Sequence, residues 1–193
     1  MSEVQQLEEQ LKEVKARLVE ARKREHHKPI RDYPLRGVGG ESVMLSELFG
    51  DKDDLLVVHN MGRGCDYCTL WADGFNGFHG HLQSRAGFAL ISNDEPSTAG
   101  EFARSRGWKF RVLSGRDSDF TKEMGYLDAD GDPWPGLTAF HRQPDGTLYR
   151  IATAALGEGD EYCSIWDMFD LLQDGWNGWE PRLCYDREMS STG

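Results

Sequence analysis

The chain has 193 residues, of which 38% are hydrophobic and 11% aromatic, which is enough for a buried core and argues against global disorder. Its formal net charge of −11 leaves no domain-wide basic surface, so nucleic acid is not expected as a partner. The first 25 residues are densely charged, and the longest aliphatic run, Leu55–Val58, is too short to cross a membrane. We therefore expect a cytoplasmic protein without membrane contact, in which the four cysteines are thiols, ligands or catalysts rather than structural disulfides.

An amphipathic helix is predicted over residues 1–28, ending before Pro29. Its apolar residues follow a heptad seam over nearly three repeats: Val4, Leu7, Leu11, Val14, Leu18 and Ala21. This seam either packs on its own domain or pairs with a second copy in a homodimer. In a pair, the antiparallel arrangement is favoured, because it places Glu8 near Lys15 and Glu3 near Arg24, whereas a parallel pair opposes like charges.

Residues 30–185 have the pattern of one α/β domain, and residues 186–193 are expected to be a disordered tail. Strands are expected at 33–36, 42–44, 55–61, 87–93, 109–113, 136–142 and 146–153. Helices are expected at 68–82, 97–106, 120–124 and 162–173, with a helical turn at 45–50. The strand at 55–61, the helix after it and the strand at 87–93 form a strand–helix–strand unit, which implies parallel strands. The Pro-Asp-Gly of "QPDG" predicts a hairpin between the last two strands.

Two cysteines, Cys65 and Cys68, lie where the strand at 55–61 leads into the helix. A CxxC pair beside such a unit in a cytoplasmic protein is typical of a redox motif. Cys65 is predicted at the helix N-terminus, where free N–H groups and the macrodipole favour a thiolate. Cys68 shares the buried stripe with Trp71 and Phe75. We therefore predict that Cys65 attacks a disulfide and that Cys68 resolves the mixed disulfide, with no organic or metal cofactor.

The segments "GCDYCTLWADGFNG" and "PGLTAF" resemble domain-of-unknown-function family 899, bacterial proteins often labelled predicted dithiol–disulfide oxidoreductases. The resemblance extends from the N-terminal helix to about residue 182. It implies a thioredoxin-like fold, with a central mixed sheet flanked by helices and an N-terminal helical extension. It also implies thiol–disulfide exchange with a protein or small-molecule substrate.

The thioredoxin likeness further implies a cis Trp134–Pro135 bond that faces the cysteine pair, with Trp134, Pro135 and Tyr67 as substrate-binding residues. It places His59, six residues before Cys65, where thioredoxins carry a proton-handling acid. An ordinary turn proline and a core histidine are the alternatives for these positions. The sequence departs from thioredoxin in the dipeptide between the cysteines, which is not Gly-Pro.

Three other functions compete with disulfide exchange. A zinc site would combine the cysteine pair with His79 and His81, although a helix would hold the two histidines about 15 Å away. A peroxiredoxin would need a hydroxyl residue three positions before the reactive cysteine, and Gly62 stands there. A non-catalytic thioredoxin-fold binding protein would tolerate Cys65→Ser. Cys163 and Cys184 carry little signal of their own.

Overall fold

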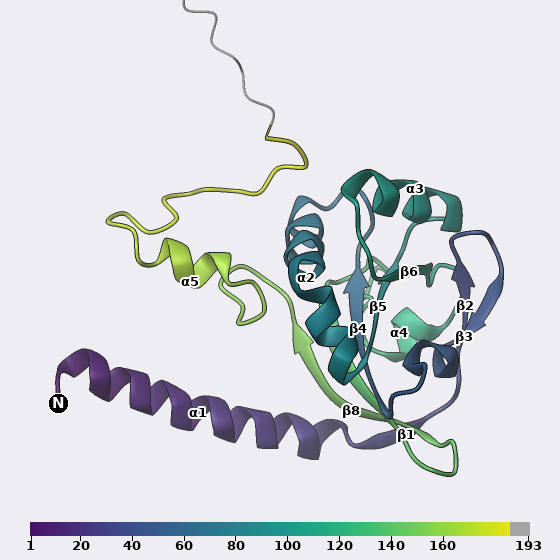
Figure 1. Ribbon diagram of the computed structural model, residues 1–193, viewed down its shortest axis with the longest axis horizontal. Helices are drawn as coiled ribbons and strands as arrows, with labels where there is room; N and C mark the ends of the chain where they lie inside the picture. Colours follow the sequence, from purple (N-terminus) through teal and green to yellow (C-terminus); the bar gives the residue numbers. More distant parts are fainter. Residues whose placement is uncertain (186–193) are drawn as a thin grey trace, which may run out of the picture.

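The computed structural model describes residues 1–185, in which the strands form one eight-stranded mixed sheet with helices on both faces (Figure 1). The strands are β1 (Lys28–Ile30), β2 (Pro34–Gly37), β3 (Ser42–Met44), β4 (Asp54–Asn60), β5 (Gly87–Ser92), β6 (Arg111–Ser114), β7 (Gly136–Arg142) and β8 (Leu148–Ala155). The helices are α1 (Glu3–His26), the 3-10 helix η1 (Leu45–Phe49), α2 (Asp66–Arg85), α3 (Pro96–Arg106), α4 (Phe120–Glu123) and α5 (Ile165–Phe169). The tail predicted at 186–193 lies outside the described residues.

The sheet order is β1-β8-β7-β4-β5-β6-β2-β3, which places β4 and β5 at its centre. β4, β5 and β6 are parallel neighbours, connected through α2 and α3, as the predicted strand–helix–strand unit requires. β7 and β8 form the predicted antiparallel hairpin, and β7 pairs with β4 on its other side. The mixed α/β fold expected from the sequence is therefore confirmed.

Both faces of the central strand β4 are buried, which explains its nearly continuous apolar run. Val57 packs into one core cluster with Phe120 and other residues from η1, α4 and the outer strands. Val58 points the other way, into a second cluster with Trp71 and Phe75 of α2. The start of α2 therefore lies over the second cluster, close to the carboxyl end of β4.

Three local predictions were wrong. β1 was not expected, because Pro29 was interpreted only as a helix terminator; β1 lies at the sheet edge, where a residue without an N–H is tolerated, and pairs with β8. α5 ends at Phe169 rather than near residue 173, and Leu171 beyond it is 87% exposed. In α2 the buried stripe is interrupted at Phe78, where the backbone leaves helical geometry, and its ring is 40% exposed.

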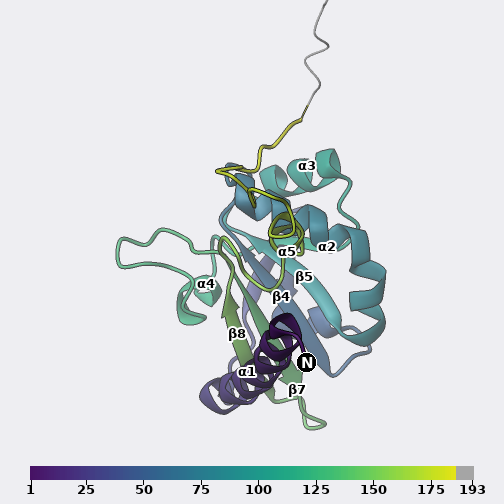
Figure 2. The ribbon, with the colours of Figure 1, turned by 90° about the vertical axis from the view of Figure 1, so that its left-hand side faces the viewer.

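The helix α1 extends beyond the sheet and contacts β8, as the two views show (Figures 1 and 2). Its attachment is polar: Lys15 and Arg22 form ion pairs with Glu161, and Arg22 donates a hydrogen bond to the Tyr162 hydroxyl. The apolar seam does not pack on the domain, since Leu11 is 65% exposed and the neighbouring seam residues are similarly open. No helix of the described chain is both long and apolar enough to cross a membrane.

Candidate functional site

The turn between β4 and α2 fixes the position of Cys65. Its first glycine, Gly62, has a φ of 120°, and its N–H donates to the Asn60 side-chain oxygen at 2.8 Å. A Cβ at Gly62 would lie 2.8 Å from an oxygen of Asp94, so a side chain there would displace this carboxylate, and the positive φ would strain its backbone. The Gly62 carbonyl accepts a hydrogen bond from the Cys65 N–H at 3.2 Å. This glycine turn therefore places Cys65 at the N-terminus of α2.

Cys65 is the N-cap residue of α2, and its Sγ accepts a hydrogen bond from the Cys68 N–H at 3.0 Å. A sulfur at this position takes the place of the oxygen that usually satisfies the free N–H groups of a first turn. The Cα atoms of the two cysteines are 5.2 Å apart, and their sulfurs are joined as a disulfide. Cys65 is partly exposed, whereas Cys68 is 2% exposed. The structure thus gives the pair the asymmetry that the sequence predicted.

Two adjoining cavities open over Cys65, and both are lined by Cys65, Tyr67 and Asp132. The first has a volume of about 400 Å³ and also reaches Trp134 and Pro135, which follow α4. The second has a volume of about 640 Å³ and is bordered by Glu180 and other residues near the C-terminal end of the described chain. The three residues predicted to bind substrate, Tyr67, Trp134 and Pro135, therefore lie around one cavity with the partly exposed sulfur.

The Trp134–Pro135 bond is trans, which corrects the cis bond expected from the thioredoxin likeness. The segment leads into β7 and is held by two backbone hydrogen bonds: the Trp134 N–H donates to the Tyr126 carbonyl at 2.8 Å, and the Leu156 N–H donates to the Pro135 carbonyl at 3.3 Å. These hydrogen bonds fix the backbone of the segment where it joins the sheet. The trans form is also the ordinary state of a peptide bond before proline. Pro135 lines the cavity nonetheless.

The dipeptide between the cysteines is tied to the loop after β8. The Tyr67 hydroxyl donates a hydrogen bond of 2.5 Å to Glu158, and this bond is the main cause that raises the pKa of Tyr67 to about 12. One turn further along α2, the Trp71 Nε1–H donates to Asp160 at 2.7 Å. No sequence pattern indicated Glu158 and Asp160, because they are brought to α2 only by the path of the chain beyond the hairpin.

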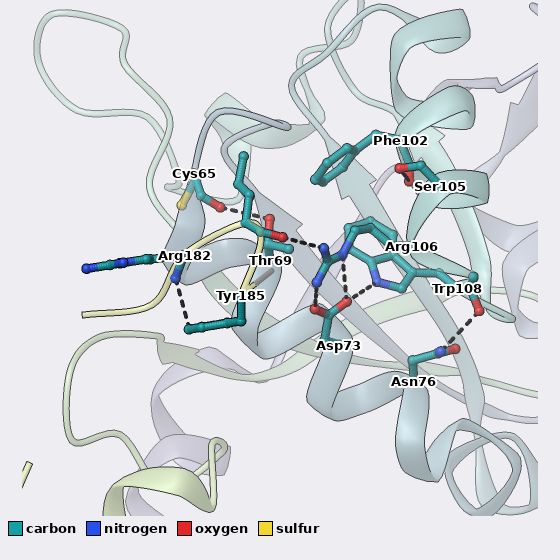
Figure 3. A network of polar contacts seen from close by, with 12 residues as sticks. Cys65, Thr69, Asp73, Asn76, Phe102, Ser105, Arg106, Trp108, Arg182 and Tyr185 are labelled. Carbon is teal, nitrogen blue, oxygen red and sulfur yellow. Dashed lines mark hydrogen bonds and ion pairs between the residues drawn. The ribbon is translucent and has the colours of Figure 1, made fainter. Parts of the chain in front are cut away.

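A polar network on the next turns of α2 holds the C-terminal segment (Figure 3). Asp73 forms a two-pronged ion pair with Arg106 at the end of α3, and it also accepts a hydrogen bond from Trp108 at 2.8 Å. Arg106 in turn donates to the carbonyl of Leu183 at 2.6 Å. This link keeps residues 180–185 beside α2, so that Glu180 can border the second cavity.

His59 lies in the protein interior, 2% exposed. Its Nε2 is 2.9 Å from the Thr138 hydroxyl, and its ring stacks on Tyr126 and Phe120. Tyr126 and Phe120 belong to one core cluster, whereas Cys68 belongs to the other. Burial lowers the pKa of His59 to about 3, so the ring is neutral at neutral pH. This geometry fits the core-histidine alternative and offers no contact with the cysteine pair.

The histidines of the zinc alternative do not gather with the cysteines. Among residues 1–185, no group of three or more His, Cys, Asp or Glu side chains is placed to hold a metal ion. Of the two remaining cysteines, Cys163 is buried and Cys184 is exposed. Burial raises the pKa of the Cys163 thiol, which disfavours its reactive form.

Comparison with known proteins matches residues 2–188 to a family described as "Bacterial protein of unknown function (DUF899)". No curated protein matches the chain. Among solved structures, the peroxidoxin BcpB of Mycobacterium tuberculosis is similar at 19% identity, with a TM-score of 0.56 over 74% of this chain and 92% of the other. A peroxiredoxin-like protein of Aquifex aeolicus has 14% identity and a TM-score of 0.54 over 68% and 75% of the two chains. The thiol peroxidase of Chromobacterium violaceum has 14% identity and a TM-score of 0.52 over 74% and 84%. These similarities establish the thioredoxin-like fold.

Proposed function

The chain belongs to the DUF899 family, and from the geometry of its cysteine pair we propose that it is a thiol–disulfide oxidoreductase. One observation carries the proposal: a partly exposed sulfur caps the N-terminus of α2 and opens into a cavity, while its partner sulfur is buried within bonding distance. The helix N-terminus favours a thiolate on Cys65. The thioredoxin-like fold and its peroxiredoxin-like neighbours are consistent with thiol-based redox chemistry.

The proposed cycle begins with both cysteines reduced. The Cys65 thiolate attacks one sulfur of a substrate disulfide, which forms a mixed disulfide and releases the first substrate thiolate, which then takes up a proton. The Cys68 thiol loses its proton to solvent, and its sulfur attacks Sγ of Cys65 and expels the second substrate thiolate, which is protonated in turn. The substrate gains two electrons and the protein loses two, so an external dithiol must reduce Cys65–Cys68 before the next turnover.

In this proposal Tyr67, Trp134 and Pro135 bind the substrate, because all three line the cavity that Cys65 faces. His59 has no step in the cycle, since its neutral ring contacts the opposite core cluster. We also propose the cytoplasmic setting expected from the sequence, where cellular dithiols would keep the pair reduced between turnovers.

A single-turnover experiment tests the cycle. The reduced full-length chain, freed of reductant, is mixed with bis(2-hydroxyethyl) disulfide, and the remaining thiols are alkylated and located by peptide mass spectrometry. Cys68→Ser should accumulate a mixed disulfide at Cys65, and Cys65→Ser should lose the reaction, whereas Cys184→Ser should behave as the wild type. A wild-type chain that reduces the disulfide no faster than Cys65→Ser and forms no mixed disulfide would favour the binding-protein alternative. Faster oxidation of Cys65 by hydrogen peroxide than by the disulfide would favour a peroxidase.

A further inference from the structure

The cavity beside Cys65 has apolar walls built from four separate parts of the chain. The β4–α2 turn, α2, the segment before β7 and the loop after β8 all contribute. Its apolar lining consists of Met61, Trp71, Pro133, Trp134, Pro135 and Leu156. A volume of about 400 Å³ is enough for one small organic group. An apolar group that adjoins the attacked disulfide would therefore lose its hydration shell here.

Every ionisable group that borders the two cavities, apart from the cysteine and tyrosine, is a carboxylate. No Lys, Arg or His side chain of the described residues lines either cavity. Six carboxylates do: Asp66, Asp94, Asp128, Asp132, Glu158 and Glu180. None of the six forms an ion pair with a cation within residues 1–185, and the hydrogen bonds that three of them accept come from backbone N–H groups or hydroxyls. The lining of the cleft therefore carries negative charge around the sulfur, with no ion-pair partner among the described residues.

We infer that the cleft over Cys65 selects disulfides with an apolar arm next to the sulfur and a cationic outer group, and that it rejects anionic disulfides. This inference rests on the proposed function, because it names the substrate class of the same cysteine pair. The apolar walls supply contact area for the arm. The surrounding carboxylates raise the local concentration of cations and repel anions, an effect that salt screens.

The two cavities contribute differently to binding of the apolar arm and to selection by charge. Trp134 lines only the first cavity, so it contacts the apolar arm, and the residue is 58% exposed and therefore open to a ligand. Asp132 lines both cavities, so its charge faces the substrate on either side of the sulfur. The reaction itself is unchanged: the Cys65 thiolate attacks the disulfide and Cys68 resolves it, with an external dithiol as the reductant.

Three aliphatic disulfides of nearly equal size but different charge separate the effect of charge on the rate from the effect of size. Cystamine is cationic, bis(2-hydroxyethyl) disulfide is neutral and 3,3′-dithiodipropionate is anionic. Each single-turnover rate constant with the reduced full-length chain is divided by that of 2-mercaptoethanol under the same conditions, which removes the intrinsic reactivity of the reagent. We expect the normalised constant to be larger for cystamine than for dithiodipropionate by at least about tenfold at low ionic strength. The ratio should shrink as salt is raised from about 10 mM to about 500 mM.

Asp132→Asn tests the effect of charge and Trp134→Ala tests the effect of the apolar arm, with Glu13→Gln as the control for charge. Asp132→Asn should lower the cystamine-to-dithiodipropionate ratio by about twofold or more, because it removes one negative charge from the lining of both cavities. Glu13→Gln removes an exposed carboxylate from α1 and should leave the ratio unchanged. Bis[4-(aminomethyl)benzyl] disulfide keeps the charge and places an aromatic arm between the sulfur and the ammonium group, so its normalised rate constant should exceed that of cystamine by about fivefold or more. Trp134→Ala should remove that gain.

The outcomes distinguish the inference from the proposed function. A normalised rate that is the same for all three charges, or that favours the anion, would overturn the substrate class while the disulfide exchange stands. Equal losses in Asp132→Asn and Glu13→Gln would do the same. If Cys65 reduces none of the disulfides faster than 2-mercaptoethanol does, the proposed function fails, and the substrate class fails with it.

Discussion

The backbone N–H of Cys68 donates a hydrogen bond to Sγ of Cys65 over 3.0 Å. In the proposed cycle the resolving residue thus stabilises the sulfur that it later attacks, because an N–H at the first turn of a helix favours a negatively charged acceptor. At the same time its own side chain is turned into the core beside Trp71, where a thiolate is disfavoured. One turn of helix therefore gives two identical side chains different environments, from which we propose different roles.

The first prediction concerns the order in which the thiols react. In the reduced protein at neutral pH, iodoacetamide should modify Cys65 about tenfold faster than Cys184, since both are accessible but only Cys65 caps a helix. The buried thiols Cys68 and Cys163 should be slowest. Peptide mass spectrometry after timed quenching measures all four sites in one sample. Equal rates at Cys65 and Cys184 would show that the helix N-terminus does not activate the thiol.

The second prediction concerns the hydrogen bond between Tyr67 and Glu158. In Glu158→Gln the pKa of Tyr67 should fall from about 12 toward its ordinary value of about 10, because the carboxylate no longer opposes the phenolate. The difference in tyrosinate absorbance between wild type and variant measures the shift, and Tyr67→Phe identifies the residue responsible. In a double-mutant cycle the pair should contribute about 1 kcal/mol or less to the free energy of unfolding, since Glu158 is exposed. An unshifted titration would contradict the contact.

The third prediction follows from the buried, neutral His59. Its pKa is about 3 in the folded chain and about 6.5 when unfolded, so the unfolded state binds the additional proton between these values. Its contribution to stability is complete above about pH 6.5 and falls by about 1.4 kcal/mol for each pH unit below that. Urea unfolding of His59→Leu between pH 4 and pH 7 should show a shallower dependence of the unfolding free energy on pH.

The control for this measurement is Thr138→Val. It removes the hydrogen-bond partner of His59 but leaves the ring buried, so it should lower stability and keep the wild-type slope. Identical slopes for His59→Leu and the wild type would mean that His59 does not cause the loss of stability in acid.

The fourth prediction is that the chain forms an antiparallel homodimer through α1, which we propose because the heptad seam remains open on the surface. Val4, Leu7 and Leu11 are each more than half exposed. Leu11→Asp should convert the dimer to a monomer in light scattering, because it buries a charge at the centre of the seam. Ala16→Asp adds the same charge outside the seam and should leave the mass unchanged. A monomeric wild type would refute the proposal.

The sequence alone was sufficient for the α/β class, the parallel β4–α2–β5 unit and the β7–β8 hairpin. These features depend on local periodicity and turn chemistry, which are written in consecutive residues. It also predicted the different environments of Cys65 and Cys68, because a separation of three residues at a helix start places one side chain at the N-cap and the other on the buried stripe.

Only the tertiary structure decided what surrounds the sulfur and what the N-terminal helix does with its apolar seam. Glu158 and Asp132 line the cavity beside Cys65 because of the paths of loops far along the chain, and such paths depend on the whole sheet order rather than on local pattern. His59 shows the same limit: its spacing from Cys65 matched a proton-handling position, but the pleat of β4 turns its ring toward Tyr126 on the other face. A position in the sequence fixes how far two residues are apart along the chain, whereas the packing of strands and helices decides which of them meet.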